Sequence, residues 1–188
     1  MIDQEYFTVQ HALKVNIEKL DPDFTFPEES AFEAEIPTPF IIANEFSQLD
    51  SMNDLAKQEL RERDLKHVVQ LLDAQNSKLN LLLNFMLAQQ DDINTRYTTT
   101  SFGASQFTFL TGNVFAEKDK LRVKLFIESP ASAIYFYGHV SNCELTEQQY
   151  QVTVKYDLMR ENDQDILIKA ALFRQQKLLR QRSLERNK

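Results

Sequence analysis

Residues that could carry out chemistry are few in this chain and lie far apart. The three histidines, His11, His67 and His139, occur singly, and Cys143 is the only cysteine. No pair of these residues has the spacing of a zinc site, and no basic cluster adjoins the thiol. With only three glycines, the chain cannot assemble a phosphate-binding loop, a dinucleotide fingerprint or a nucleophile elbow. The sequence therefore predicts a protein that is not an enzyme and that uses neither a metal nor a cofactor.

Composition narrows the class of protein further. The chain has 188 residues, enough for one compact domain with an appendage or for two small domains. Its formal net charge of -7 argues against a general DNA-binding role. A single cysteine permits no intrachain disulfide, and no apolar run approaches the ~20 residues that span a bilayer. The N-terminus also lacks the pattern of a signal peptide, so we expect a soluble cytoplasmic protein.

Charge is unevenly distributed along the chain. Residues 1–60 hold thirteen acidic residues and three lysines, whereas residues 169–188 hold seven Lys or Arg residues and one Glu. These two regions can be solvated surfaces of opposite sign. Alternatively, the basic tail contacts the acidic N-terminal region or an anionic partner such as a lipid or RNA.

The first half of the chain predicts one strand, an extended segment and a long helix. Residues 6–16 are rich in β-branched and aromatic types and suit a strand. Residues 17–40 carry four prolines and predict a loop or extended linker. Residues 51–90 contain neither Gly nor Pro and predict helix, with a break near 61–64 where Asp64 could cap a second helix.

The second half changes to the alternating pattern of β-strands. Several short alternating runs are bounded by turn residues, which favours an antiparallel sheet or a small barrel. The clearest of these runs are Gln106–Phe109, Leu121–Leu125, Ile134–Tyr137 and Tyr150–Tyr156. A helix over 163–185, capped by Asn162, is expected to end the chain. With the strand at 6–16, we predict an α+β fold with six strands.

A heptad seam runs through the predicted long helix. Its members recur at alternating spacings of four and three, the rhythm of a helix that packs along another helix. They are Leu65, Val69, Leu72, Asn76, Leu79, Leu83 and Met86. The pattern predicts a homo-oligomer, a dimer or tetramer, with Asn76 setting the register. The alternative is an intramolecular hairpin with the preceding segment or with the C-terminal helix.

Residues 99–180 resemble a PilZ domain. The segment 99–107 stands where that family has its Asp/Asn-x-Ser-x-x-Gly motif and the following strand. Gly138-His139-Val140 resembles the family's G-x-V strand, and 166–180 resembles the helix that closes its barrel. The resemblance implies a six-stranded antiparallel β-barrel with a C-terminal helix, to which this chain adds a long inserted helix. It also implies a regulatory role, because many members of the family bind the bacterial second messenger cyclic di-GMP.

The nucleotide-binding residues of that family are mostly absent here. The arginine positions of its RxxxR motif fall near Glu5 and Val9. In the second motif Ser101 remains, whereas Thr99 replaces the acid or amide and Ala104 replaces the glycine. Arginine binds phosphates through charge-assisted hydrogen bonds, so without it we do not expect the usual binding mode. A non-standard site would have to use other arginines, namely Arg96, Arg174, Arg180 or Arg182.

The chain therefore resembles the divergent PilZ-like proteins that lack the nucleotide motifs and self-associate through an added helix. We predict three regions: an N-terminal strand and acidic proline-containing segment (1–48), a helical oligomerisation segment (49–94) and a PilZ-like barrel with its helix (95–188). The expected function is that of a non-enzymatic regulator or adaptor with a protein partner, in cyclic di-GMP signalling such as motility. The alternative is an atypical cyclic di-GMP receptor.

Overall fold

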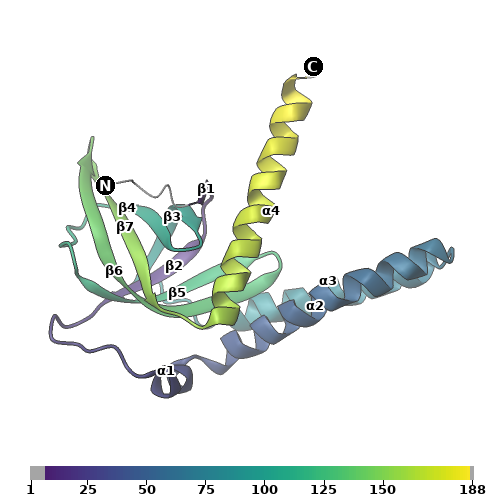
Figure 1. Ribbon diagram of the computed structural model, residues 1–188, viewed down its shortest axis with the longest axis horizontal. Helices are drawn as coiled ribbons and strands as arrows, with labels where there is room; N and C mark the ends of the chain where they lie inside the picture. Colours follow the sequence, from purple (N-terminus) through teal and green to yellow (C-terminus); the bar gives the residue numbers. More distant parts are fainter. Residues whose placement is uncertain (1–6, 187–188) are drawn as a thin grey trace.

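A closed antiparallel barrel forms the body of the molecule, and two helical arms project from it (Figure 1). The computed structural model describes residues 7–186, although not the side chains of residues 50–55, 185 and 186. The strands are β1 (Thr8–Gln10), β2 (Lys14–Lys19), β3 (Arg96–Gly103), β4 (Gln106–Thr111), β5 (Lys120–Glu128), β6 (Ala131–Thr146) and β7 (Gln149–Leu158). The helices are α1 (Glu29–Glu35), α2 (Thr38–Glu62), α3 (Lys66–Ala88) and α4 (Glu161–Arg186).

Strand pairing closes the sheet on itself. The order is β1-β3-β2-β5-β6-β7-β4, and an additional pairing of β3 with β4 completes the ring. Both β1 and β2 pair with β3, at Thr8–Gln10 and Lys14–Asn16 respectively, so together they act as one interrupted strand. The predicted six-stranded barrel is confirmed, and the predicted strand at 6–16 is correct in type but is divided.

A bulge divides this N-terminal strand, and Thr99 holds it in place. Gln10 pairs with Ser101 and Lys14 with Thr98, so the N-terminal strand has one extra residue between these pairs. The buried Thr99 hydroxyl accepts a hydrogen bond from the Leu13 N–H at 2.9 Å and donates one to the His11 carbonyl at 2.8 Å. This side chain therefore satisfies backbone groups that the bulge takes out of the ladder.

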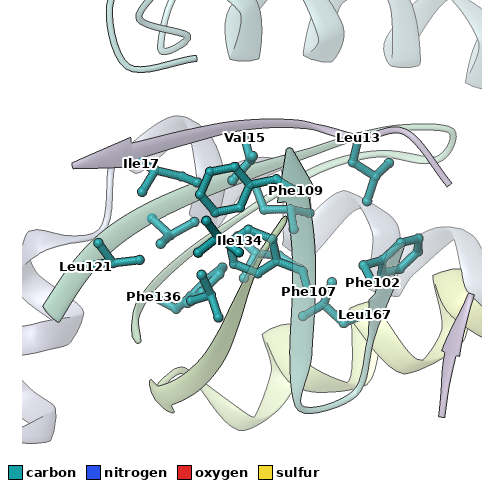
Figure 2. Packing of buried hydrophobic residues seen from close by; sticks show 14 of the residues in the cluster. Leu13, Val15, Ile17, Phe102, Phe107, Phe109, Leu121, Ile134, Phe136 and Leu167 are labelled. Carbon is teal, nitrogen blue, oxygen red and sulfur yellow. The ribbon is translucent and has the colours of Figure 1, made fainter. Parts of the chain in front are cut away.

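Aromatic and aliphatic side chains from alternate strand positions fill the barrel (Figure 2). Phe107, Phe109 and Phe136 are fully buried, and the rings of Phe107 and Phe136 meet edge to face at 6.1 Å. Leu167 and Ala171 from the first half of α4 join the same cluster. This interior agrees with the period-two pattern of the strands, because one face of each strand is directed into the barrel.

The α2–α3 hairpin is anchored on the outside of the barrel. Phe40 and Ala43 of α2 and Leu83 and Leu87 of α3 are buried in a second cluster with Phe126. Beyond this anchored part, the hairpin extends away from the barrel (Figure 1). The predicted break near 61–64 is confirmed, since α2 ends at Glu62 and α3 begins at Lys66.

Several expected helix boundaries were wrong. The N-cap residue of α3 is Leu65, because Asp64 adopts a left-handed φ of 60° in the turn and cannot cap. Helix α2 begins at Thr38, inside the segment expected to be a loop, because Pro37 and Pro39 lie at its start, where their missing N–H groups cost nothing. Helix α4 begins at Glu161, so Asn162 lies within it.

The segment before α2 also folds onto the barrel. The Phe24 and Phe26 rings lie 5.4 and 5.6 Å from the ring of Tyr137 on β6. At the end of α1, the Glu35 carboxylate accepts hydrogen bonds from the hydroxyls of Tyr135 and Tyr137. The acidic, proline-containing segment is therefore an ordered strap that leads from β2 to the helical hairpin.

Candidate functional site

The three positions of the second nucleotide motif do not form an open binding surface. Thr99 is buried and bonded to the bulge, as described above. The Ser101 hydroxyl shares a hydrogen bond with the Thr108 hydroxyl at 2.7 Å. The backbone carbonyl of Ala104 accepts a hydrogen bond from Gln164 of α4 at 3.3 Å. Each position therefore has an intramolecular role in this structure.

The two positions that align with the arginine motif offer no cation either. Val9 lies in β1 with its side chain buried in the barrel core. Glu5 lies outside the described residues. An aliphatic side chain directed into the core cannot contact a phosphate from solvent.

The other candidate arginines are not brought together. Arg96 at the start of β3 is paired with Asp91, with both contacts at 2.9 Å. Arg174 lies midway along α4, close enough to His11 to help lower its pKa. Arg180 and Arg182 are exposed further along α4, in the part that leaves the barrel (Figure 1). Of these residues, Arg174 lines a cavity where α4 and the α2–α3 hairpin meet the barrel.

The heptad seam is divided between the interior and the surface. Val69 and Leu83 are buried, and Met86 packs against the cluster under the hairpin. Leu65, Leu72 and Leu79 stay about two-fifths exposed, and Asn76 is half-buried. The intramolecular hairpin thus covers one side of the seam, while the other side remains available to a partner. Which residues contact a second copy remains a prediction.

An apolar stripe beside the buried side of α3 is left uncovered. We call it the outer stripe; its members recur at helical spacings of three, four and seven and are 40% to 66% exposed. They are Val68, Leu71, Leu72, Leu79 and Leu82. Phe85 and Leu81 beside it are also largely exposed. Contiguous apolar residues of this kind on a surface indicate an interaction site.

The second arm, α4, is fixed at its base by a buried carboxylate. Asp163 accepts hydrogen bonds from Arg160 at 2.8 and 3.0 Å and from Asn44 of α2 at 2.7 Å. The Asn44 amide also donates to the Ala133 carbonyl of β6 at 3.0 Å. Burial raises the pKa of Asp163, and its bonds to Arg160 oppose that shift. This junction positions both arms relative to the barrel.

Beyond that junction, α4 also carries apolar residues into solvent. Leu172, Phe173, Leu179 and Leu184 are all largely exposed among basic residues.

No cluster of His, Cys, Asp or Glu suited to a metal ion occurs among the described residues. Nor is any described helix long and apolar enough to cross a bilayer.

The sequence predicted part of the outer stripe, since Leu72 and Leu79 belong to the heptad seam, but not the junction of the two arms. Each residue turns an α-helix by roughly 100°. The middle of the outer stripe lies about that angle around α3 from the buried Val69 and Leu83. The strip Leu81-Leu82-Leu83, apolar on nearly all sides, was the signal for it. The Asp163–Asn44 contact joins residues that are 119 positions apart, and no local pattern identifies such a pair.

Comparison with known proteins gives structural likeness without sequence likeness. No protein-family model and no curated protein matches the chain. A tetrameric PilZ domain from Xanthomonas campestris, described as self-assembled through an unusual helical bundle, is similar with a TM-score of 0.53 and 14% identity. That similarity covers 97% of this chain and 92% of the other.

The inhibitor of motility MotI/DgrA of Bacillus subtilis is also similar, with a TM-score of 0.49 and 13% identity over 94% of this chain. This chain spans only 53% of that protein's length. The closed six-stranded barrel, the C-terminal helix and the likeness to the Xanthomonas structure agree with one another. The chain has a divergent PilZ-like fold.

Proposed function

We propose that this protein is a non-enzymatic PilZ-like regulator or adaptor that self-associates through its helical arms. The observation that carries the proposal is the outer stripe, which presents apolar side chains on a helix already anchored to the barrel. Two copies that pair these stripes would remove leucine side chains from water, each contributing roughly 1.5–3 kcal/mol. The exposed leucines of α4 extend the available apolar surface.

The tetrameric Xanthomonas structure supports this mode of assembly, because it is similar over nearly the whole of both chains and assembles through helices. The wide apolar surface of α3 suits a bundle better than a two-stranded coiled coil, whose apolar seam is narrow. We place the process in bacterial cyclic di-GMP signalling, with motility as the first process to test and a protein as the regulated partner.

Adding charge to the outer stripe is expected to dissociate the oligomer. At about 50 μM, light scattering of the unaltered protein should give a multiple of 22.0 kDa. Replacing Leu71→Glu and Leu82→Glu together should give the monomer mass, because four or more carboxylates would have to be desolvated in a paired interface. Both side chains are more than 60% exposed in the single chain, so its fold should not change.

The matched control carries the same two charges on another face of α3. Gln70→Glu and Ser77→Glu are exposed positions turned away from the outer stripe, and this variant should keep the parent mass. A monomeric parent protein at that concentration would contradict the proposal. If the control variant dissociates as readily as the stripe variant, the outer stripe is not the interface.

Cyclic di-GMP is not expected to bind through the motif positions. A ligand present at 100 times its dissociation constant should stabilise the protein by about 2.7 kcal/mol. We expect ~100 μM cyclic di-GMP to produce no thermal shift that depends on Ser101, because Val9 and Thr99 are buried and engaged. A shift that Ser101→Ala abolishes would contradict this prediction. A shift that Ser101→Ala leaves intact would favour the atypical-receptor alternative.

A further inference from the structure

A cavity of about 470 Å³ opens where the α2–α3 hairpin, α4 and one end of the barrel meet. Figure 1 shows the two arms leaving the barrel from neighbouring points and diverging. The volume lies within the usual range for small-molecule sites. None of the nucleotide-motif positions Thr99, Ser101 and Ala104 lines this cavity. It is therefore distinct from those three positions, although Phe102 of the same strand lines it.

The floor and one wall of the cavity are apolar. Leu13, Phe102 and Ile166 come from the barrel end and the base of α4, and all three are otherwise buried in the core. Phe173, an exposed residue of α4, lines the same space. A planar or aliphatic group placed there would be covered by side chains that the protein has already ordered.

The charged residues of the lining all have the same sign. Lys169 and Arg174 extend from α4, and Lys57 faces the cavity from α2. Lys57 pairs with Asp73 at 2.9 Å, whereas neither Lys169 nor Arg174 forms an ion pair within the described residues. No Asp or Glu occurs among the described lining residues, although the chain has 28 acidic residues against 21 basic ones.

The surroundings of His11 indicate the electrostatic potential inside the cavity. Its ring lies 6.2 Å from that of Phe102, and it lines the cavity. Burial lowers the pKa of His11, and the nearby charges of Arg174 and Lys177 lower it further, while Glu128 opposes them. Burial disfavours a charge of either sign, but the contribution from Arg174 and Lys177 reflects nearby positive charge, which favours a negative charge on a ligand.

We propose that this cavity binds a small organic anion, with an apolar or aromatic body and a phosphate, sulfonate or carboxylate group. The body lies against Phe102 and Phe173, and the acidic group is held by Arg174 and Lys169. Ser129 in the β5–β6 turn and Ser132 at the start of β6 add neutral polar residues to the lining. The ligand thus contacts the barrel end and α4, in a cavity that Lys57 and Asn76 of the α2–α3 hairpin also line.

Binding of two dyes with the same aromatic skeleton to the full chain tests the proposal. The anionic probe is 1-anilinonaphthalene-8-sulfonate, and the neutral probe is N-phenyl-1-naphthylamine, which lacks the sulfonate. We expect Arg174→Gln and Lys169→Gln each to weaken binding of the anionic probe on the order of tenfold, since a charge-assisted hydrogen bond is lost. Binding of the neutral probe should stay unchanged. Phe173→Ala should weaken binding of both dyes.

Arg180→Gln is the matched control, because it removes the same charge from α4 outside the described lining of the cavity. The His11 ring signals in proton NMR provide a second measurement, and they should shift when the anionic dye binds. Equal effects of Arg174→Gln and Arg180→Gln, or His11 signals that do not move, would overturn the proposal. The mass of every variant is measured on the same samples, so that a change in assembly is distinguished from a loss of the site.

Discussion

Replacing Gly138 with alanine is expected to lower the free energy of unfolding by about 2–3 kcal/mol, the upper part of the range for overpacked sites. A Cβ on this residue would overlap the backbone carbonyl oxygen of Lys155 and lie 3.2 Å from Cγ1 of Val154. Gly138 pairs with Tyr156 at a register shift between β6 and β7. Relief of the overlap would require these two strands to separate. Thermal unfolding should show a melting temperature lower by roughly 5–10 °C.

Gly112→Ala is the control for this prediction. A Cβ at Gly112 would have no atom within 4 Å, so this substitution should change stability by less than about 0.5 kcal/mol. The two variants share the chemical change and differ only in the space around the glycine. Similar melting temperatures for both would show that β7 does not approach β6 as closely as the structure indicates.

Asp163→Ala should have a comparable or larger effect, a loss of about 3 kcal/mol or more. The Asp163 carboxylate is fully buried and accepts hydrogen bonds from both Arg160 and Asn44. Without it, the Arg160 guanidinium has lost its partner while its side chain is only 19% exposed. Denaturant unfolding measures the loss, and limited proteolysis should show earlier cleavage in α4.

Asp165→Ala supplies the comparison, because Asp165 lies in the same turn of α4 but is exposed. Its removal should leave the unfolding free energy within about 0.5 kcal/mol of the parent. A loss from Asp163→Ala no greater than that from Asp165→Ala would mean that the carboxylate does not hold the two arms at the barrel.

The strands after residue 95 could be predicted because each depends on the alternation of apolar and polar residues within its own short segment. Alternating side chains at 121–125 and 150–156 place one set in the barrel, as the buried Leu121, Val123, Val152 and Val154 confirm. The start of α2 could not be predicted from the same kind of rule. Proline removes a hydrogen bond inside a helix but favours the first turn, and the sequence does not distinguish these two cases at Pro37 and Pro39.

The heptad seam shows a different limit of prediction from the sequence. Its spacing correctly indicated a helix with an apolar flank, but α3 has two such flanks, one marked by Val69 and one by Val68. Which flank the same chain covers depends on how α2 folds back along α3 and on β6, which is distant in sequence. The cavity could not be predicted for the same reason, because Lys57, Phe102 and Arg174 meet only in the folded chain.

The interrupted N-terminal strand has a consequence for how the molecule folds. Its partner strand β3 follows only after residues 20–95, whereas two-residue turns join β5 to β6 and β6 to β7. Closing so long a loop costs on the order of 2–3 kcal/mol more entropy than a short turn. The interrupted N-terminal strand is therefore expected to join the barrel last. Until it does, β3 and β5 each have an unpaired edge. In the oligomer that we propose, an open edge is also where the N-terminal strand of one chain could pair with the barrel of another.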